Sequence, residues 1–129
     1  MPADRAIHDL GRMLRNLPLR LMILSDAASA HTVRWIHALA GRGHDILLFS
    51  LSPVPAEAYA GLSTVTFVSP GIGAEIARSG EGALGKLRYL EALPLLRAHI
   101  RDWRPDLVHA HYASSYGLLA TLARARPRI

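Results

Sequence analysis

The stretch that decides the fold is Leu19-Arg20-Leu21-Met22-Ile23-Leu24-Ser25-Asp26. A short apolar run that ends in polar residues is typical of a strand buried on both faces. The segment from His31 to Arg42 follows with helical spacing, because one face collects the apolar residues Val33, Ile36, Leu39 and Ala40. A buried strand followed by an amphipathic helix predicts a parallel α/β sheet.

The same alternation continues along the chain. Apolar or β-branched runs, bounded by proline, glycine and polar residues, predict three more strands at residues 45–50, 64–68 and 106–111. A long helical stretch covers residues 84–103, and Pro94 is expected to split it. A last helix is predicted from about Ser115. These elements predict an open, Rossmann-like sheet of about four parallel strands with flanking helices. The usual order of such a sheet is 3-2-1-4, and we expect that order here.

Residues 1–18 form an extension ahead of this domain, which covers residues 19–129. An apolar stripe at helical spacing predicts that the extension is a helix; its members are Ile7, Leu10, Leu14 and Leu17. We expect it to dock on the sheet as a short helix, or to precede the native start codon. A helix on a membrane surface is the weaker interpretation, because the segment is short and also carries acidic residues.

Length and composition limit the class of protein. The chain has 129 residues, about one domain, and 50% of them are hydrophobic, which excludes a disordered chain. It has no cysteine, which excludes disulfides and thiolate metal sites. Asp4 and Asp9 interrupt the region where a signal peptide is apolar. We therefore expect a cytoplasmic globular domain.

The charge pattern narrows the choice of partners. The net charge is +5, and Lys86 is the only lysine among 15 basic residues. The arginines are spread along the chain without interleaved aromatics, which argues against nucleic acid. Phosphate-bearing ligands, or an anionic surface at the inner face of the membrane, are better matches for this charge.

Polar residues gather in the loop after the first strand. In an open parallel sheet, ligands bind beyond the carboxyl ends of the strands. Small residues there give backbone N–H groups access to a ligand, and the start of the next helix favours an anion. No glycine occurs between Gly11 and Gly41, so the dinucleotide fingerprint and the Walker A motif are both absent. The candidate binding residues in this loop are Asp26, Ser29, His31 and Thr32. For His31, helix capping is an equal alternative.

A second polar loop follows the fourth strand. His109 and His111 lie on one face of that strand, because side chains alternate with period two. We expect His111, Tyr112 and Ser115 to line the cleft. A metal site is not expected, because the sequence offers no third ligand at a known spacing. No G-x-S-x-G motif surrounds Ser115, so it is expected to cap a helix and not to act as a nucleophile.

Three separated blocks carry a family likeness. They read L-M-I-L-S-D-x-x-S-x-H-T-x-R-W, A-x-x-G-R-G-H-D-I-x-L-F-S and R-P-D-L-V-H-A-H-Y-x-S-S-Y-G. In this order and spacing they resemble the N-terminal domain of family 4-type glycosyltransferases, over residues 19–129. The resemblance implies a GT-B architecture of two Rossmann-like domains, in which this one receives the acceptor. It also implies hexose transfer from a nucleotide-sugar, with retention of configuration and without a metal ion or other cofactor. The acceptor is a sugar, a polysaccharide or a lipid-linked saccharide. Many relatives have a glycine pair in the first loop, where this chain has Ala27 and Ala28.

The resemblance also implies that much of the enzyme is absent from this sequence. The next strand of the family is expected near Arg128, and the donor domain with its paired glutamates is expected after it. We therefore expect a fragment that transfers no sugar alone and that has no catalytic residue we can assign. The strand at 106–111 would then be an exposed edge, which predicts a homodimer. The alternatives are a non-catalytic α/β binding module and a subunit of a split transferase; the genomic sequence after Ile129 distinguishes a fragment from a split enzyme.

Overall fold

The computed structural model describes residues 2–15, 17–70, 87–111 and 116–123. Its centre is a sheet of four parallel strands in the order β3-β2-β1-β4. The strands are β1 (Arg20–Leu24), β2 (Asp45–Phe49), β3 (Val65–Val68) and β4 (Leu107–Ala110). The predicted Rossmann-like sheet and its strand order are confirmed.

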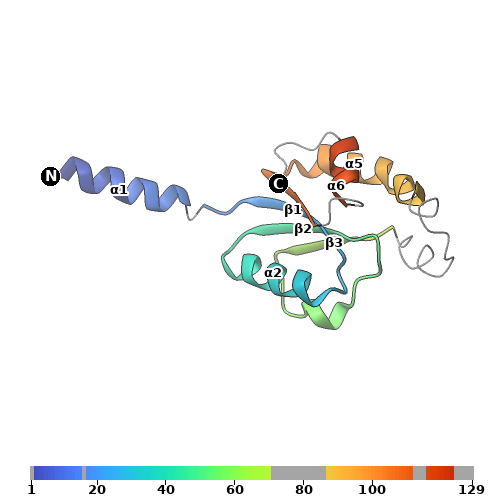
Figure 1. Cartoon of the computed structure of the whole chain (residues 1–129). Helices are drawn as coiled ribbons and strands as arrows, with labels where there is room; N and C mark the ends of the chain where they lie inside the picture. Colours follow the sequence, from blue (N-terminus) through green and yellow to red (C-terminus); the bar gives the residue numbers. More distant parts are fainter. Residues whose placement is uncertain (1, 16, 71–86, 112–115, 124–129) are drawn as a thin grey trace.

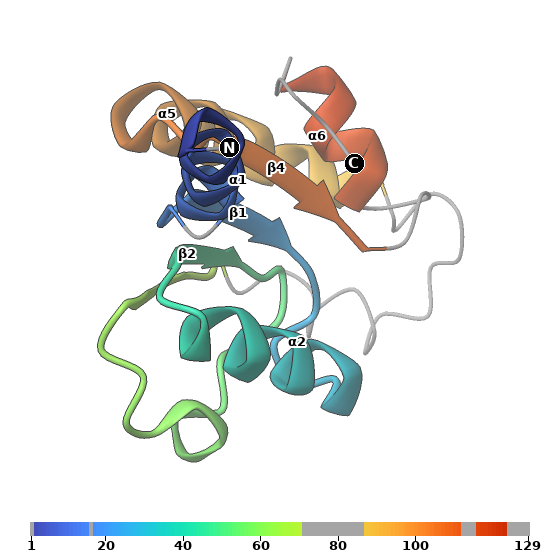
Figure 2. The same cartoon turned by 90° about the vertical axis from the view of Figure 1, so that its left-hand side faces the viewer.

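Helices cover both faces of this sheet, as Figures 1 and 2 show. On one face lie α2 (Ala30–Gly41) and the short 3-10 helix η1 (Ala56–Tyr59). On the other lie α5 (Leu93–Trp103) and α6 (Gly117–Leu122). Successive residues of a strand point to opposite faces, so β1 supplies Leu21 and Ile23 to the core under α2 and Met22 and Leu24 to the core under α5 and α6.

The central strands are buried because they are covered from both sides. From Leu21 to Leu24, and again from Ile46 to Phe49, the side chains are almost inaccessible to solvent. This explains why both segments are continuously apolar and do not alternate with polar residues. The strand pairs are in register from Arg20 opposite Asp45 to Leu24 opposite Phe49. β1 also pairs with β4, with Leu24 opposite Ala110, so the carboxyl ends of β1 and β4 lie side by side.

Pro94 divides the predicted long helix. A 3-10 helix, η2 (Leu87–Ala92), precedes α5, and Pro94 occupies the first turn of α5, where a missing N–H costs nothing. The end of α5 is a left-handed cap at Arg104, with φ 51°. The 3-10 helix η1 between β2 and β3 was not predicted from the sequence.

The extension is helical but does not dock. Helix α1 (Pro2–Arg15) projects from the body at the end of the sheet where the strands begin (Figure 1). Ile7 and Met13 are 70% and 66% exposed, so the expectation of a helix packed on the sheet is wrong. Among the described residues, no helix combines the length and the apolar character needed to cross a membrane.

Candidate functional site

Two hydrogen bonds hold the loop between β1 and α2 at Ala27. The N–H of Ala27 donates to Oγ of Ser50 at 3.0 Å, and the hydroxyl of Tyr59 donates to the carbonyl oxygen of Ala27 at 2.6 Å. Tyr59 is 3% exposed and comes from η1. Burial, together with the negative charge of Asp26, raises the pKa of Tyr59 to about 12. Ala27 is thus held through both its N–H and its carbonyl oxygen.

Asp26 folds the loop onto itself. Its Oδ1 accepts a hydrogen bond from the N–H of Ala28 at 2.9 Å, and its carbonyl oxygen accepts one from the N–H of Ser29 at 3.1 Å. With the bond from Ala27 to Ser50, three successive N–H groups of the loop have internal partners. These groups are therefore engaged inside the protein and not directed at a ligand. Ser29 is the N-cap residue of α2, but its side chain makes no capping hydrogen bond.

Ser25, Thr32 and His111 form a buried hydrogen-bonded chain. Oγ of Ser25 lies 2.6 Å from Oγ1 of Thr32 and 2.8 Å from Nδ1 of His111. Both hydroxyl residues are fully buried. Thr32 was predicted to line the cleft. Its hydroxyl instead faces Ser25 inside the protein, so Thr32 holds Ser25 in place and does not face a ligand. These two hydrogen bonds join the ends of β1 and β4 to the first turn of α2.

Four aromatic rings lie close together at the His111 end of this hydrogen-bonded chain. The ring centroid of His111 lies 4.7 Å from that of His109, 5.5 Å from that of His31 and 5.8 Å from that of Trp35. Trp35 stacks on His109 with an interplanar angle of 13°. We call these four residues the ring cluster. His31 and Trp35 are exposed, whereas His109 and His111 are partly buried.

One ring nitrogen in this cluster is buried without a partner. Nε2 of His111 has no hydrogen bond in the described structure, although Nδ1 is bonded to Ser25. Burial lowers the pKa of His111, and the neighbouring His109 and His31 lower it further; burial alone lowers the pKa of His109. Because Nε2 is buried and unpaired, His111 is the residue of the cluster best prepared to bind a polar ligand atom.

The ring cluster was compared with the ligand sets that hold metal ions. In the part of the chain that the structure describes, no group of three or more histidine, aspartate or glutamate side chains is arranged to hold an ion. The three histidines lie edge-on or tilted to one another, and the edge-to-face contact of His109 and His111 belongs to side-chain packing.

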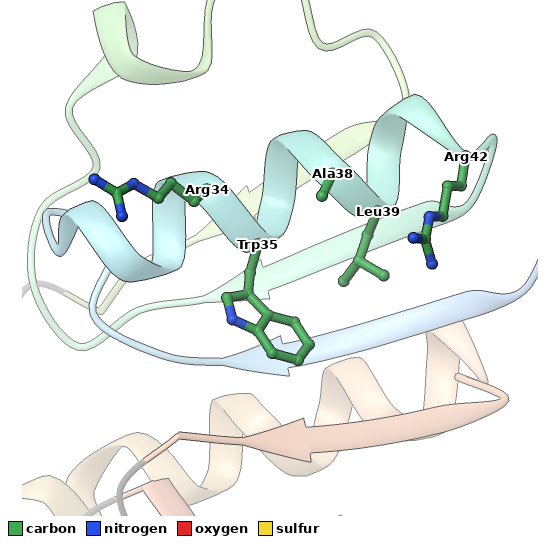
Figure 3. Close-up of a pocket in the computed structure, with 5 residues that line it drawn as sticks. All are labelled: Arg34, Trp35, Ala38, Leu39 and Arg42. Atoms are coloured by element: carbon green, nitrogen blue, oxygen red, sulfur yellow. The ribbon is translucent and has the colours of Figure 1, made fainter.

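A pocket of about 370 Å³ continues from the ring cluster along α2 (Figure 3). Its lining residues are Arg34, Trp35, Ala38, Leu39 and Arg42. Trp35 and Leu39 point from the helix toward the sheet, and Trp35 belongs to both the pocket and the ring cluster. A partly exposed indole therefore connects the carboxyl ends of the strands to a groove beside α2.

The structure brings together only some of the residues chosen from the sequence. Thr32 and His111 both contact Ser25, and His31 lies beside His111. Asp26 and Ser29 shape the loop next to them. Tyr112 and Ser115 lie outside the described residues. Sequence reasoning missed Ser25, Trp35 and His109 as site residues. The four-residue spacing of His31 and Trp35, one helical turn, was a usable signal for an aromatic pair.

Comparison with known proteins gives one strong match. Residues 20–129 match the sequence model of a family described as glycosyl transferase 4-like. The crystal structure of the Bordetella bronchiseptica enzyme WbmH in complex with NAD+ is similar at a TM-score of 0.49 and 17% sequence identity. That match covers 83% of this chain but 33% of the WbmH chain, so this sequence spans a third of that structure. No curated protein sequence matches this chain.

Proposed function

Because the chain belongs to the glycosyl transferase 4-like family, we propose that it forms the acceptor side of a GT-B glycosyltransferase. The complete enzyme moves a hexose from a nucleotide-sugar to a sugar, polysaccharide or lipid-linked acceptor. The transfer retains the anomeric configuration and needs no metal ion. The nucleotide-sugar binds to a donor domain outside this sequence, so the isolated chain is inactive.

The observation that carries this proposal is the unpaired Nε2 of His111 inside the ring cluster. A sugar ring has an apolar C–H face and a rim of hydroxyl groups. Trp35 is 42% exposed and offers an apolar surface, while the imidazoles of His31 and His111 offer hydrogen-bonding nitrogens beside it. This combination of an apolar surface with a few fixed polar atoms is typical of small-molecule sites.

We assign the residues the following roles. His111 hydrogen-bonds an acceptor hydroxyl through Nε2, and burial lowers the pKa of its ring. His31 binds the same acceptor from the start of α2. Ser25 and Thr32 are positioning residues that fix the His111 ring through Nδ1. Asp26 and Ser29 hold the loop. Tyr112 and Ser115 are further candidate acceptor-binding residues from the sequence.

A binding experiment on the isolated chain tests the acceptor assignment. A panel of hexoses and disaccharides should shift the ring resonances of His31 and His111 in NMR spectra. His111→Gln should abolish the response, and His8→Gln, on the remote helix α1, should leave it unchanged. If neither ring responds to any saccharide while a nucleotide-sugar binds the same residues, the acceptor assignment is refuted.

A transfer assay tests the expected inactivity separately. Radiolabelled nucleotide-sugars incubated with the isolated chain and the saccharide panel should give no labelled product. Turnover by this chain alone would show that it contains a complete catalytic site. Tight binding of saccharides or nucleotides without turnover in the full-length protein would instead favour the alternative of a non-catalytic binding module.

A further inference from the structure

The apolar stripe of α1 is uncovered in this chain. The exposed fractions are 70% for Ile7, 55% for Leu10, 66% for Met13 and 50% for Leu17. Ile7, Leu10 and Met13 recur every three positions and therefore share one side of α1, and Leu17 follows the helix. A row of large exposed apolar side chains at this spacing marks an interaction surface and not ordinary surface composition.

The opposite side of α1 is polar and carries charges of both signs. At 100° per residue, the positions of Arg5, His8 and Arg12 lie within a narrow arc directly opposite Leu10. All three side chains are exposed, and the described structure gives none of them an ion-pair partner. Asp4 and Asp9 flank this arc. The whole chain carries a net charge of +5, so it is attracted to anionic surfaces.

The apolar surface continues from α1 onto the body. Leu19, just before β1, is 41% exposed. Arg20 follows it, with its guanidinium 4.7 Å from the ring centroid of Trp103. This surface lies at the end of the sheet where the strands begin, whereas the ring cluster lies at the end where they finish (Figure 1). Occupation of α1 therefore leaves the candidate site open.

We propose that α1 lies in the headgroup region of an anionic lipid bilayer, with Ile7, Leu10, Met13 and Leu17 toward the acyl chains. A 14-residue helix is about 21 Å long, shorter than the hydrocarbon core of about 30 Å, so it lies on the bilayer and does not cross it. The exposed apolar side chains supply the main attraction, and the arginines add attraction to anionic headgroups. This inference does not depend on the proposed glycosyltransferase function.

A second copy of the chain is the less favoured occupant. A stable protein interface buries about 800 Å² on each partner. One narrow stripe on a helix about 21 Å long provides much less than that. A bilayer covers the stripe completely without requiring a complementary protein surface. Its negative charge also matches the net charge of this chain.

Co-sedimentation of the full chain with large unilamellar vesicles tests the proposal. Vesicles of phosphatidylcholine with 30% phosphatidylglycerol should sediment the wild-type chain, and pure phosphatidylcholine should bind it more weakly. Leu10→Asp should reduce binding about tenfold or more, because it places a charge in the apolar face. His8→Asp is the matched control: it changes the charge equally but on the polar face, and should retain binding within about threefold. Circular dichroism should show both variants folded, since neither residue contacts the sheet.

Two outcomes would overturn the proposal. One is the absence of wild-type binding to the anionic vesicles, or equal binding by the Leu10→Asp and His8→Asp variants. The other is a wild-type dimer in light scattering that Leu10→Asp converts to a monomer, which would identify a second copy as the occupant of α1.

Discussion

Oγ of Ser25 lies 2.8 Å from Nδ1 of His111 and joins two residues that are 86 positions apart in the sequence. Ser25 follows β1 and His111 follows β4, and these strands are neighbours in the sheet. The same Oγ lies 2.6 Å from Oγ1 of Thr32. One buried hydroxyl therefore fixes both the start of α2 and the orientation of the His111 ring.

Ser25→Ala should destabilise the fold by about 1–3 kcal/mol, because it leaves two buried polar atoms without a partner. Urea unfolding measures this free energy. Ser29→Ala is the control: the Ser29 side chain makes no capping hydrogen bond, so its loss should cost less than about 0.5 kcal/mol. Equal costs for the two variants would show that the Ser25 hydroxyl contributes nothing specific.

Acidification should destabilise the protein through His109 and His111. The pKa values of both rings are lowered in the folded state, so the unfolded state takes up protons first as the pH falls. Their stabilising contribution is complete above the unfolded pKa of about 6.5 and is lost progressively below it. Urea unfolding at pH 7.5 and pH 5 measures the loss. His109→Gln/His111→Gln should reduce this pH dependence, and His8→Gln should not.

Tyr59→Phe should cost about 1–3 kcal/mol, because the buried carbonyl oxygen of Ala27 loses its hydrogen bond. Ser63→Ala, at an exposed position, should change the free energy of unfolding by less than about 0.5 kcal/mol. Ultraviolet titration of the wild type should show one phenolate forming near pH 12, absent from the variant. The contribution of Tyr59 to stability is present below pH 10 and lost between about pH 10 and 12. A normal titration of Tyr59 would contradict the buried contact.

The exposed side of β4 should promote self-association. In the sheet formed by the described residues, β4 pairs on one side only, with β1. Unpaired backbone groups on an edge strand can pair with another chain. Light scattering should therefore show the mass rising toward a dimer with concentration. Leu10→Asp should leave this association unchanged, because α1 is remote from β4. A monomer at high concentration would contradict the prediction.

Local pattern was enough to predict the sheet. The apolar runs at β1 and β2, the proline-split helix and the periodicity of α2 each report a local preference, and the expected order 3-2-1-4 is the usual order of a sheet of this kind. Local pattern could not predict whether α1 packs on the sheet. An amphipathic pattern shows that a helix has an apolar face, but not whether the body offers a matching surface.

The sequence by itself determined the strands, their order and the end of the sheet at which polar loops gather, because these depend on periodicity and on chain connectivity. It also indicated that His109 and His111 share a face. Only the tertiary structure decided that His31, Trp35, His109 and His111 form one ring cluster, that Thr32 faces inward to Ser25, and that Nε2 of His111 is left unpaired. The physical reason is that these contacts join β1, α2 and β4 across 86 residues, and their geometry depends on how a helix packs over two neighbouring strands.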